Sequence, residues 1–244
     1  MTAQIGDRLI FQGETVVLFS NPLESYFDDA HPRPKFPRAS TACWRGYVAT
    51  WQIGVENLFL QAIDSEERMW RSEERPRENA LWDLVFPDSP SPVLADWYTG
   101  ELRIPRGERL EYVHMGYASR YERELYLSLE EGEIFLSELR DQDGKILDNT
   151  LFRRPPSIRN DDDWAFILAA REQPDDATRR LVYADWLQER GDLRADVIRT
   201  MNEHQQDPKN ESARKVATTA IEAVQPKQWS WLQLMGYDRL QAWF

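Results

Sequence analysis

The sequence of 244 residues has little of the chemistry that usually marks a catalytic or metal-binding site. Its single cysteine, Cys43, excludes a disulfide within the chain and suits a reducing compartment. Three scattered histidines and one cysteine match no common zinc spacing, so no metal or other cofactor is expected. No apolar run reaches the ~18 residues of a membrane span, and the first residues lack the basic and apolar regions of a secretory signal. We therefore expect a cytoplasmic protein that does not bind a membrane.

Positive charge is also scarce. The chain has 30 Lys and Arg against 42 Asp and Glu, which gives a formal net charge of -12. Sequence-independent binding to DNA or RNA depends on basic side chains that neutralise phosphates, so no nucleic-acid partner is expected. An acidic chain suits a basic protein partner instead. The glycines form no dinucleotide-binding or P-loop pattern, and no Gly-x-Ser-x-Gly elbow is present, so no catalytic residue is assigned.

The first region of the chain, residues 1–140, has the short alternating runs of β-strands. Residues 8–12 and 15–19 are β-prone and lie on either side of Gly13-Glu14, a hairpin signal. Further strands are expected at 46–53, 58–63, 102–105, 109–114, 124–129 and 134–139. Short strands separated by turn signals predict an antiparallel β-rich domain, either a rolled sheet or a sandwich.

The second region, residues 161–244, has helical spacing. The acidic run from Asp161 suits a helix N-terminus, and Asp175 or Asp176 can cap a second helix that ends near Gly191. Apolar residues with helical spacing then predict two more helices, around 197–201 and 213–224.

Residues 141–160 contain Gly144, Pro155 and Pro156 and are expected to form a linker. The predicted fold class is α+β, in which an N-terminal antiparallel β-rich domain precedes a small C-terminal helical bundle.

One stretch of the helical region has a specific pattern: an apolar helix, then Pro-Asp-Asp, then Arg-Leu-x-Tyr-Ala-Asp-Trp-Leu-x-Glu-Arg-Gly-Asp. It is carried by Pro174, Asp175, Asp176, Arg180, Leu181, Tyr183, Ala184, Asp185, Trp186, Leu187, Glu189, Arg190, Gly191 and Asp192. The pattern resembles the bacterial repeat-companion domain, a short domain found beside leucine-rich repeats and other bacterial modules. The resemblance implies a bacterial protein in which this region has no catalytic activity.

The same stretch contains candidate binding residues, Asp185, Arg190 and Arg194, with opposite charges on neighbouring helical turns. They could recognise a partner chain, or they could form a charge network that fixes helix packing around Tyr183 and Trp186. Surface pairs at these spacings are common and mostly local, which favours the second interpretation.

The β-rich region has two clusters of aromatic and basic residues that could line a groove for a ligand or peptide. They consist of Trp44, Arg45 and Tyr47, and of His114, Tyr117 and Arg120. Alternation along a strand is expected to bury about half of such side chains. Cys43 could pair with a histidine for nucleophilic chemistry, but no motif surrounds it, and a small buried residue is the favoured interpretation.

These observations predict a non-catalytic protein–protein interaction module, an adaptor or regulatory partner. Its expected partner is another protein, for which a basic protein or one encoded nearby is the candidate. Two alternatives remain open. One is an immunity or inhibitor protein that neutralises a basic toxin or effector. The other is an enzyme whose site lies in the β-rich half and combines residues distant in sequence.

Overall fold

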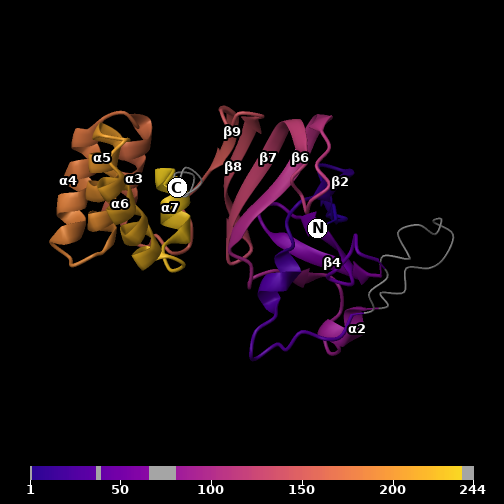
Figure 1. Cartoon of the computed structure of the whole chain (residues 1–244). Coiled ribbons are helices and arrows are strands. Elements are labelled where there is room, and N and C mark those ends of the chain that lie inside the picture. The colour runs from indigo at the N-terminus through magenta and orange to yellow at the C-terminus, as the bar shows by residue number, and fades with distance from the viewer. Residues whose placement is uncertain (1, 37–39, 66–80, 238–244) are drawn as a thin grey trace. The chain divides into compact units, whose positions relative to one another are not determined.

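The first sheet begins with the predicted hairpin. Strands β1 (Asp7–Phe11) and β2 (Glu14–Leu18) pair antiparallel. Both residues of the turn between them, Gln12 and Gly13, have positive φ, as the primed two-residue turns require. β3 (Val48–Ile53), β4 (Leu58–Asp64) and the short β5 (Val93–Leu94) complete a sheet of order β2-β1-β3-β4-β5 (Figure 1).

One pairing in this sheet was not predicted: β1 and β3 run parallel. Parallel strands need a crossover connection rather than a tight turn. The connection here contains a 3-10 helix, η1 (Pro22–Tyr26), and lies in a proline-rich part of the sequence.

The second sheet is an antiparallel meander. It consists of β6 (Gly100–Glu111), β7 (Arg120–Glu130), β8 (Glu133–Asp141) and β9 (Ile146–Phe152). The strand expected at 102–105 and the first part of the one expected at 109–114 form one strand, β6, which ends at Glu111. Its pairing with β7 shifts register between Arg106 and Glu111. The two sheets share one hydrophobic core, and a short helix, α2 (Trp82–Val85), also contributes to it. Core residues include Leu9, Trp51, Leu60, Leu102, Leu127 and Ile134.

The chain divides into two compact units, Met1–Arg153 and Arg154–Phe244. This corrects the linker predicted at 141–160, because that range contains β9 and the first unit extends beyond residue 140. Gly144 lies in the hairpin turn between β8 and β9. Gly144 has a φ of 83°, and Asp141 Oδ1 accepts hydrogen bonds from the amides of Asp143 and Lys145.

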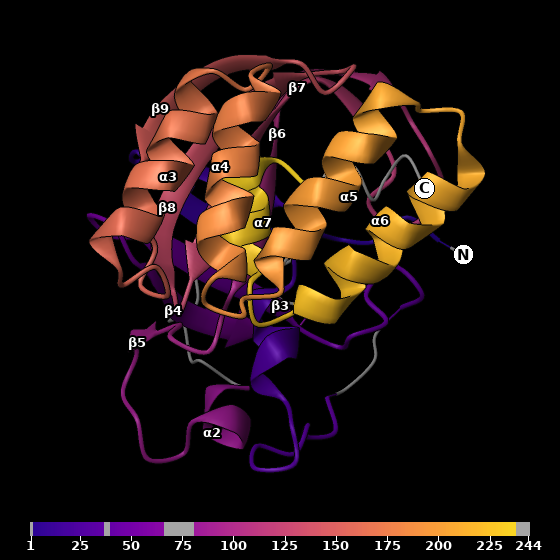
Figure 2. The ribbon, with the colours of Figure 1, turned by 90° about the vertical axis from the view of Figure 1, so that its left-hand side faces the viewer.

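The second unit contains α3 (Asp161–Glu172), α4 (Ala177–Gln188), α5 (Arg194–Gln206), α6 (Glu211–Val224) and α7 (Trp229–Met235). Figure 2 shows α3 to α6 side by side in chain order. Side chains of Asn160, Asp176 and Asn210 cap the N-termini of α3, α4 and α6. Gly191, with a φ of 67°, follows α4 as predicted.

The computed structural model describes residues 2–36, 40–65 and 81–237. Within them the architecture is mixed α+β, with two sheets in which most neighbouring strands are antiparallel. No helix in these ranges is both long and apolar enough to cross a membrane.

Candidate functional site

The six candidate residues of the β-rich unit divide into an inward and an outward set. Arg45 and Tyr47 are buried and Tyr117 is half-buried. Trp44, His114 and Arg120 are exposed. The two sets alternate within the same short segments, so the clusters do not form one groove. They form a buried support and an exposed surface above it.

The buried support is centred on an ion pair between Asp7 and Arg45. Arg45 is 3% exposed and Asp7 is fully buried, with 2.8 Å between Arg45 Nη2 and Asp7 Oδ1. Asp7 also accepts hydrogen bonds from the Trp51 indole at 3.0 Å and the Ala49 amide at 3.1 Å. Burial raises the pKa of the Asp7 carboxyl, against the opposing effects of the Arg45 charge and these hydrogen bonds. The ion pair therefore fixes β1, β3 and the segment before β3 to one another.

Arg45 also contacts a second set of polar groups through its Nη1 atom. Nη1 donates to the Ile5 carbonyl at 2.8 Å and lies 3.0 Å from the Tyr117 hydroxyl. Burial raises the pKa of Tyr117 to about 12, so its hydroxyl keeps its proton and donates to Asn21 Oδ1 at 2.9 Å. Phe19 stacks on the Tyr117 ring, with 5.1 Å between the ring centroids. These contacts hold the loop between β6 and β7 against the N-terminal segment.

Trp44 lies on the turn that this ion pair anchors. The Gly46 amide donates to the Cys43 carbonyl at 3.0 Å, and Gly46 has a φ of 83°, a conformation that favours glycine. The Trp44 amide donates to Gln4 Oε1 at 3.2 Å. Its side chain is 58% exposed, and the other tryptophans within the described ranges are buried or half-buried. A rigid turn therefore presents one large indole to solvent.

The loop after β6 lies on the same N-terminal segment. Gly116 forms backbone hydrogen bonds with Thr2 and Gln4, and Trp44 binds the Gln4 side chain. In this loop Tyr112 is 55% exposed and Met115 is 49% exposed. We call the exposed side chains of the two segments the aromatic loop surface, which consists of Trp44, Tyr112, His114 and Met115.

Basic side chains flank the aromatic loop surface. The Arg109 guanidinium lies 5.1 Å from the centre of the Tyr112 ring, and the Tyr112 hydroxyl lies 2.8 Å from His114 Nδ1. Arg120, predicted as a binding residue, is exposed and forms a loose ion pair with Glu111 at 3.9 Å. The surface thus has aromatic groups with a charged border, as interfaces between proteins commonly have.

Cys43 is a small buried residue, as the sequence favoured over a catalytic pair with a histidine. The Cys43 thiol is fully buried and donates to the Tyr47 carbonyl at 3.1 Å, whereas His114 is exposed and binds Tyr112. In the ranges that the structure describes, no group of three or more His, Cys, Asp or Glu side chains is arranged to hold a metal ion.

The candidate residues of the helical unit form internal contacts. Arg194 is 6% exposed, and its Nη2 lies 3.0 Å from Asp163 and 2.7 Å from Asp192. Tyr183, which is fully buried, donates to Asp163 and accepts a hydrogen bond from the Trp231 indole at 3.0 Å. These contacts join the start of α3 to the start of α5.

The remaining two candidates of this unit are exposed but also have local partners. Asp185 pairs with Arg199 at 2.7 Å. The Arg190 guanidinium lies 3.9 Å from the centre of the Trp186 ring, and Trp186 is half-buried against Phe166. Asp185 therefore links α4 to α5, and Arg190 packs against its own helix end.

Asp7 and Met115 were missed from sequence. A signal for Asp7 was present, because strand alternation places it on the same face as the core residue Leu9. A carboxylate on a buried face needs a charged or hydrogen-bonding partner. Nothing in the local sequence identifies that partner as Arg45.

Comparison of the chain with protein-family models, with curated proteins and with solved structures finds no match.

Proposed function

We propose that this protein is a non-catalytic protein-binding module and that its β-rich unit contacts the partner through the aromatic loop surface. The observation that carries the proposal is the exposure of Trp44 on a turn fixed by a buried ion pair. Burial of an exposed indole at an interface is strongly favourable, and tryptophan is enriched at interfaces between proteins. An indole held in solvent on a rigid turn is therefore suited to contact a partner.

The turn that carries Trp44 is also ordered before any partner binds. Interface residues that contribute most to affinity are commonly Trp, Tyr and Arg, surrounded by weaker contacts that exclude water. Binding also costs free energy for every loop and side chain that becomes ordered. Hydrogen bonds of the Trp44 and Gly46 amides, together with the Arg45 ion pair, already order this turn, so little of that cost remains for the complex.

The partner that we propose is a basic protein. The chain has a formal net charge of -12, and most of the excess of acidic residues lies in residues 1–153, the unit that bears the aromatic loop surface. Such a field accelerates encounter with a positively charged partner and slows it for an acidic one. The sequence resemblance to the repeat-companion domain supports an association with other bacterial modules but does not define the contact.

The test measures binding kinetics between the full chain and basic proteins encoded next to its gene. We expect Trp44→Ala to weaken binding by at least about 30-fold, mainly through faster dissociation. Leu84→Ala is the matched control, since Leu84 is 51% exposed in the same unit but lies outside the aromatic loop surface. Raising the salt concentration should slow association, because screening shortens the range of the attraction.

Two results would contradict the proposal. One is equal binding by the wild-type protein and by Trp44→Ala, which would place the interface elsewhere. The other is loss of biological effect without loss of binding in a variant of the aromatic loop surface, which would indicate a reaction at that surface.

A further inference from the structure

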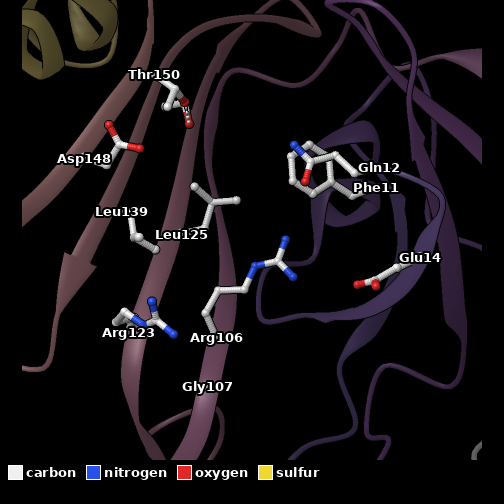
Figure 3. A pocket seen from close by; sticks show the side chains of 11 residues that line it. Phe11, Gln12, Glu14, Arg106, Gly107, Arg123, Leu125, Leu139, Asp148 and Thr150 are labelled. Carbon is white, nitrogen blue, oxygen red and sulfur yellow. Dashed lines mark hydrogen bonds between the residues drawn. The ribbon is translucent and has the colours of Figure 1, made fainter.

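A second feature of the β-rich unit lies apart from the aromatic loop surface. A groove of about 440 Å³ runs between the tip of the β1–β2 hairpin and one face of the β6–β9 sheet (Figure 3). Phe11 and Glu14 line it from the hairpin, and Arg106, Arg123, Leu125 and Asp148 line it from the sheet. This volume is in the range of small-molecule sites, which is about 300–1,000 Å³.

The groove continues the core-facing side of the sheet. On β6 this side is formed by Leu102 and Ile104, which are fully buried, and the next residue with the same orientation is Arg106. On β7 the corresponding stripe runs from Leu127 through Leu125 to Arg123. The apolar stripe of each strand therefore ends in an arginine where the sheet extends beyond the core.

The two arginines are cross-strand neighbours on the same face of the sheet. Arg106 and Arg123 are directly paired in the β6–β7 register. Like charges in opposite positions on neighbouring strands destabilise a sheet. Within the described ranges neither guanidinium forms an ion pair with a carboxylate, and Arg106 packs over the Phe11 ring at 5.6 Å. By contrast Arg103, on the opposite face of β6, pairs with Glu124.

We propose that this groove binds a small organic carboxylate. The carboxylate would lie between the guanidinium groups of Arg106 and Arg123, where it relieves their repulsion and accepts charge-assisted hydrogen bonds. Its apolar part would lie on Phe11, Leu125 and Leu139, which form the apolar wall of the groove.

A singly charged ligand fits the groove better than a phosphate ester or another multiply charged anion. Glu14 and Asp148 also line the groove, and Figure 3 shows them on opposite sides of the arginines. Their charges oppose each additional negative charge on a ligand. They leave room for one carboxylate and favour a ligand whose remaining surface is apolar or positively charged.

The test uses calorimetric titration of the full chain with benzoate, benzamide and inorganic phosphate. We expect benzoate to bind saturably with a dissociation constant in about the millimolar range, as a ligand of this size allows. Benzamide, which has the same shape without the charge, should bind at least about tenfold more weakly. Phosphate should bind more weakly than benzoate.

Variants locate the site. The double variant Arg106→Gln/Arg123→Gln should weaken benzoate binding at least about tenfold, since it removes both charged donors. Arg109→Gln is the matched control, because Arg109 is on the same strand and exposed but does not line the groove. Thr150→Trp, at an exposed lining position, should block the groove and abolish binding without changing its charge.

The proposal is wrong if benzoate shows no saturable binding to the wild-type chain, or if the double variant binds it as tightly as the wild type. Phosphate binding equal to or tighter than benzoate would also overturn it, because it would indicate attraction of anions in general. Should the double variant fail to fold, Arg123→Gln alone, at an exposed position, makes the same comparison.

Discussion

Each unit of this protein contains a buried aspartate–arginine pair with a tyrosine hydroxyl and a tryptophan indole beside it. In the first unit Asp7 and Arg45 meet Tyr117 and Trp51. In the second unit Asp163 and Arg194 meet Tyr183 and Trp231. The components are the same, but the number of carboxylates differs.

Arg45 has one carboxylate partner and fills its other contacts with the Ile5 carbonyl and Tyr117. Within the described residues its buried Nε has no hydrogen-bond acceptor. Arg194 has two carboxylates, since Asp192 also binds it and has a side chain that is 26% exposed. The first pair is therefore shielded from water, and Arg45 has a single counter-charge in it. In the second pair Arg194 has two counter-charges, and the Asp192 side is partly exposed to water.

The two ion pairs also connect different structural elements. Asp7 and Arg45 join a strand to the turn that presents Trp44, so the pair positions a surface. Asp163 and Arg194 join the first turn of α3 to the first turn of α5, so the pair positions helices. Loss of the first pair should affect both stability and binding, and loss of the second should affect stability alone.

The largest effect is expected for Arg45→Met. The substitution leaves the Asp7 carboxylate buried without its counter-charge, which typically costs about 3–5 kcal/mol of unfolding free energy. Urea unfolding of the full chain, followed by the fluorescence of its buried tryptophans, measures this cost. The exposed Arg120→Met is the control and should change the unfolding free energy by less than about 0.5 kcal/mol. A cost below about 1 kcal/mol for Arg45→Met would show that Asp7 becomes neutral without penalty.

A smaller effect is expected for Arg194→Met. Asp163 keeps the hydrogen bond from Tyr183, and Asp192 can turn toward water, so the cost should be about 1–3 kcal/mol. The same urea unfolding measures it, with Arg159→Met as the exposed control in the same unit. If Arg194→Met lowered the unfolding free energy as much as Arg45→Met, the second carboxylate would add no protection. The contrast between the two units would then disappear.

Much of the fold could be predicted from local patterns. The β1–β2 hairpin, the strands around Trp51 and Leu127 and the helix caps at Asp176 and Gly191 follow from alternation, turn residues and capping. The parallel pairing of β1 with β3 could not, because it joins segments through a long connection without a periodic signal. β9 was missed because its five exposed residues lack the alternation of a half-buried strand.

The candidate site could be predicted as a set of residues but not as an arrangement. Sequence patterns placed Trp44 and Arg45 in one aromatic and basic cluster and Tyr117 in another. In the structure Arg45 Nη1 lies 3.0 Å from the Tyr117 hydroxyl. Which side chains face inward depends on Asp7, which lies 38 residues before Arg45 and pairs with it only in the folded chain. The groove at Arg106 was not predicted, since its two walls come from different sheets.

The smallest expected effect is a pH dependence of stability. It distinguishes the buried pairs of the two units most directly. Partial burial opposes the ionisation of Asp192, but hydrogen bonds and charge from Arg194 outweigh it and hold the pKa of this carboxyl below its ordinary value. A lowered pKa means that the stabilisation is fully present above the unfolded pKa of about 3.9 and is lost as the pH falls through the folded value. Because the pair is open to water, we expect it to contribute about 0.5–1 kcal/mol. The Asp7 carboxyl has the opposite sign, since burial raises its pKa, so the same fall in pH removes no stabilisation there.

Hydrogen exchange of the full chain between about pH 5 and pH 3, corrected for the intrinsic rates, separates the two cases. Amides at the start of α5 should lose protection as the pH falls, and Asp192→Asn should remove most of that loss because it cannot titrate. Asp185→Asn is the matched control, since Asp185 is an exposed carboxylate paired with Arg199 in the same unit. Amides of β1, beside Asp7, should lose less protection over the same range. Equal losses at β1 and at the start of α5 would mean that both buried pairs respond to pH in the same way, and that the second carboxylate on Arg194 does not distinguish the two units.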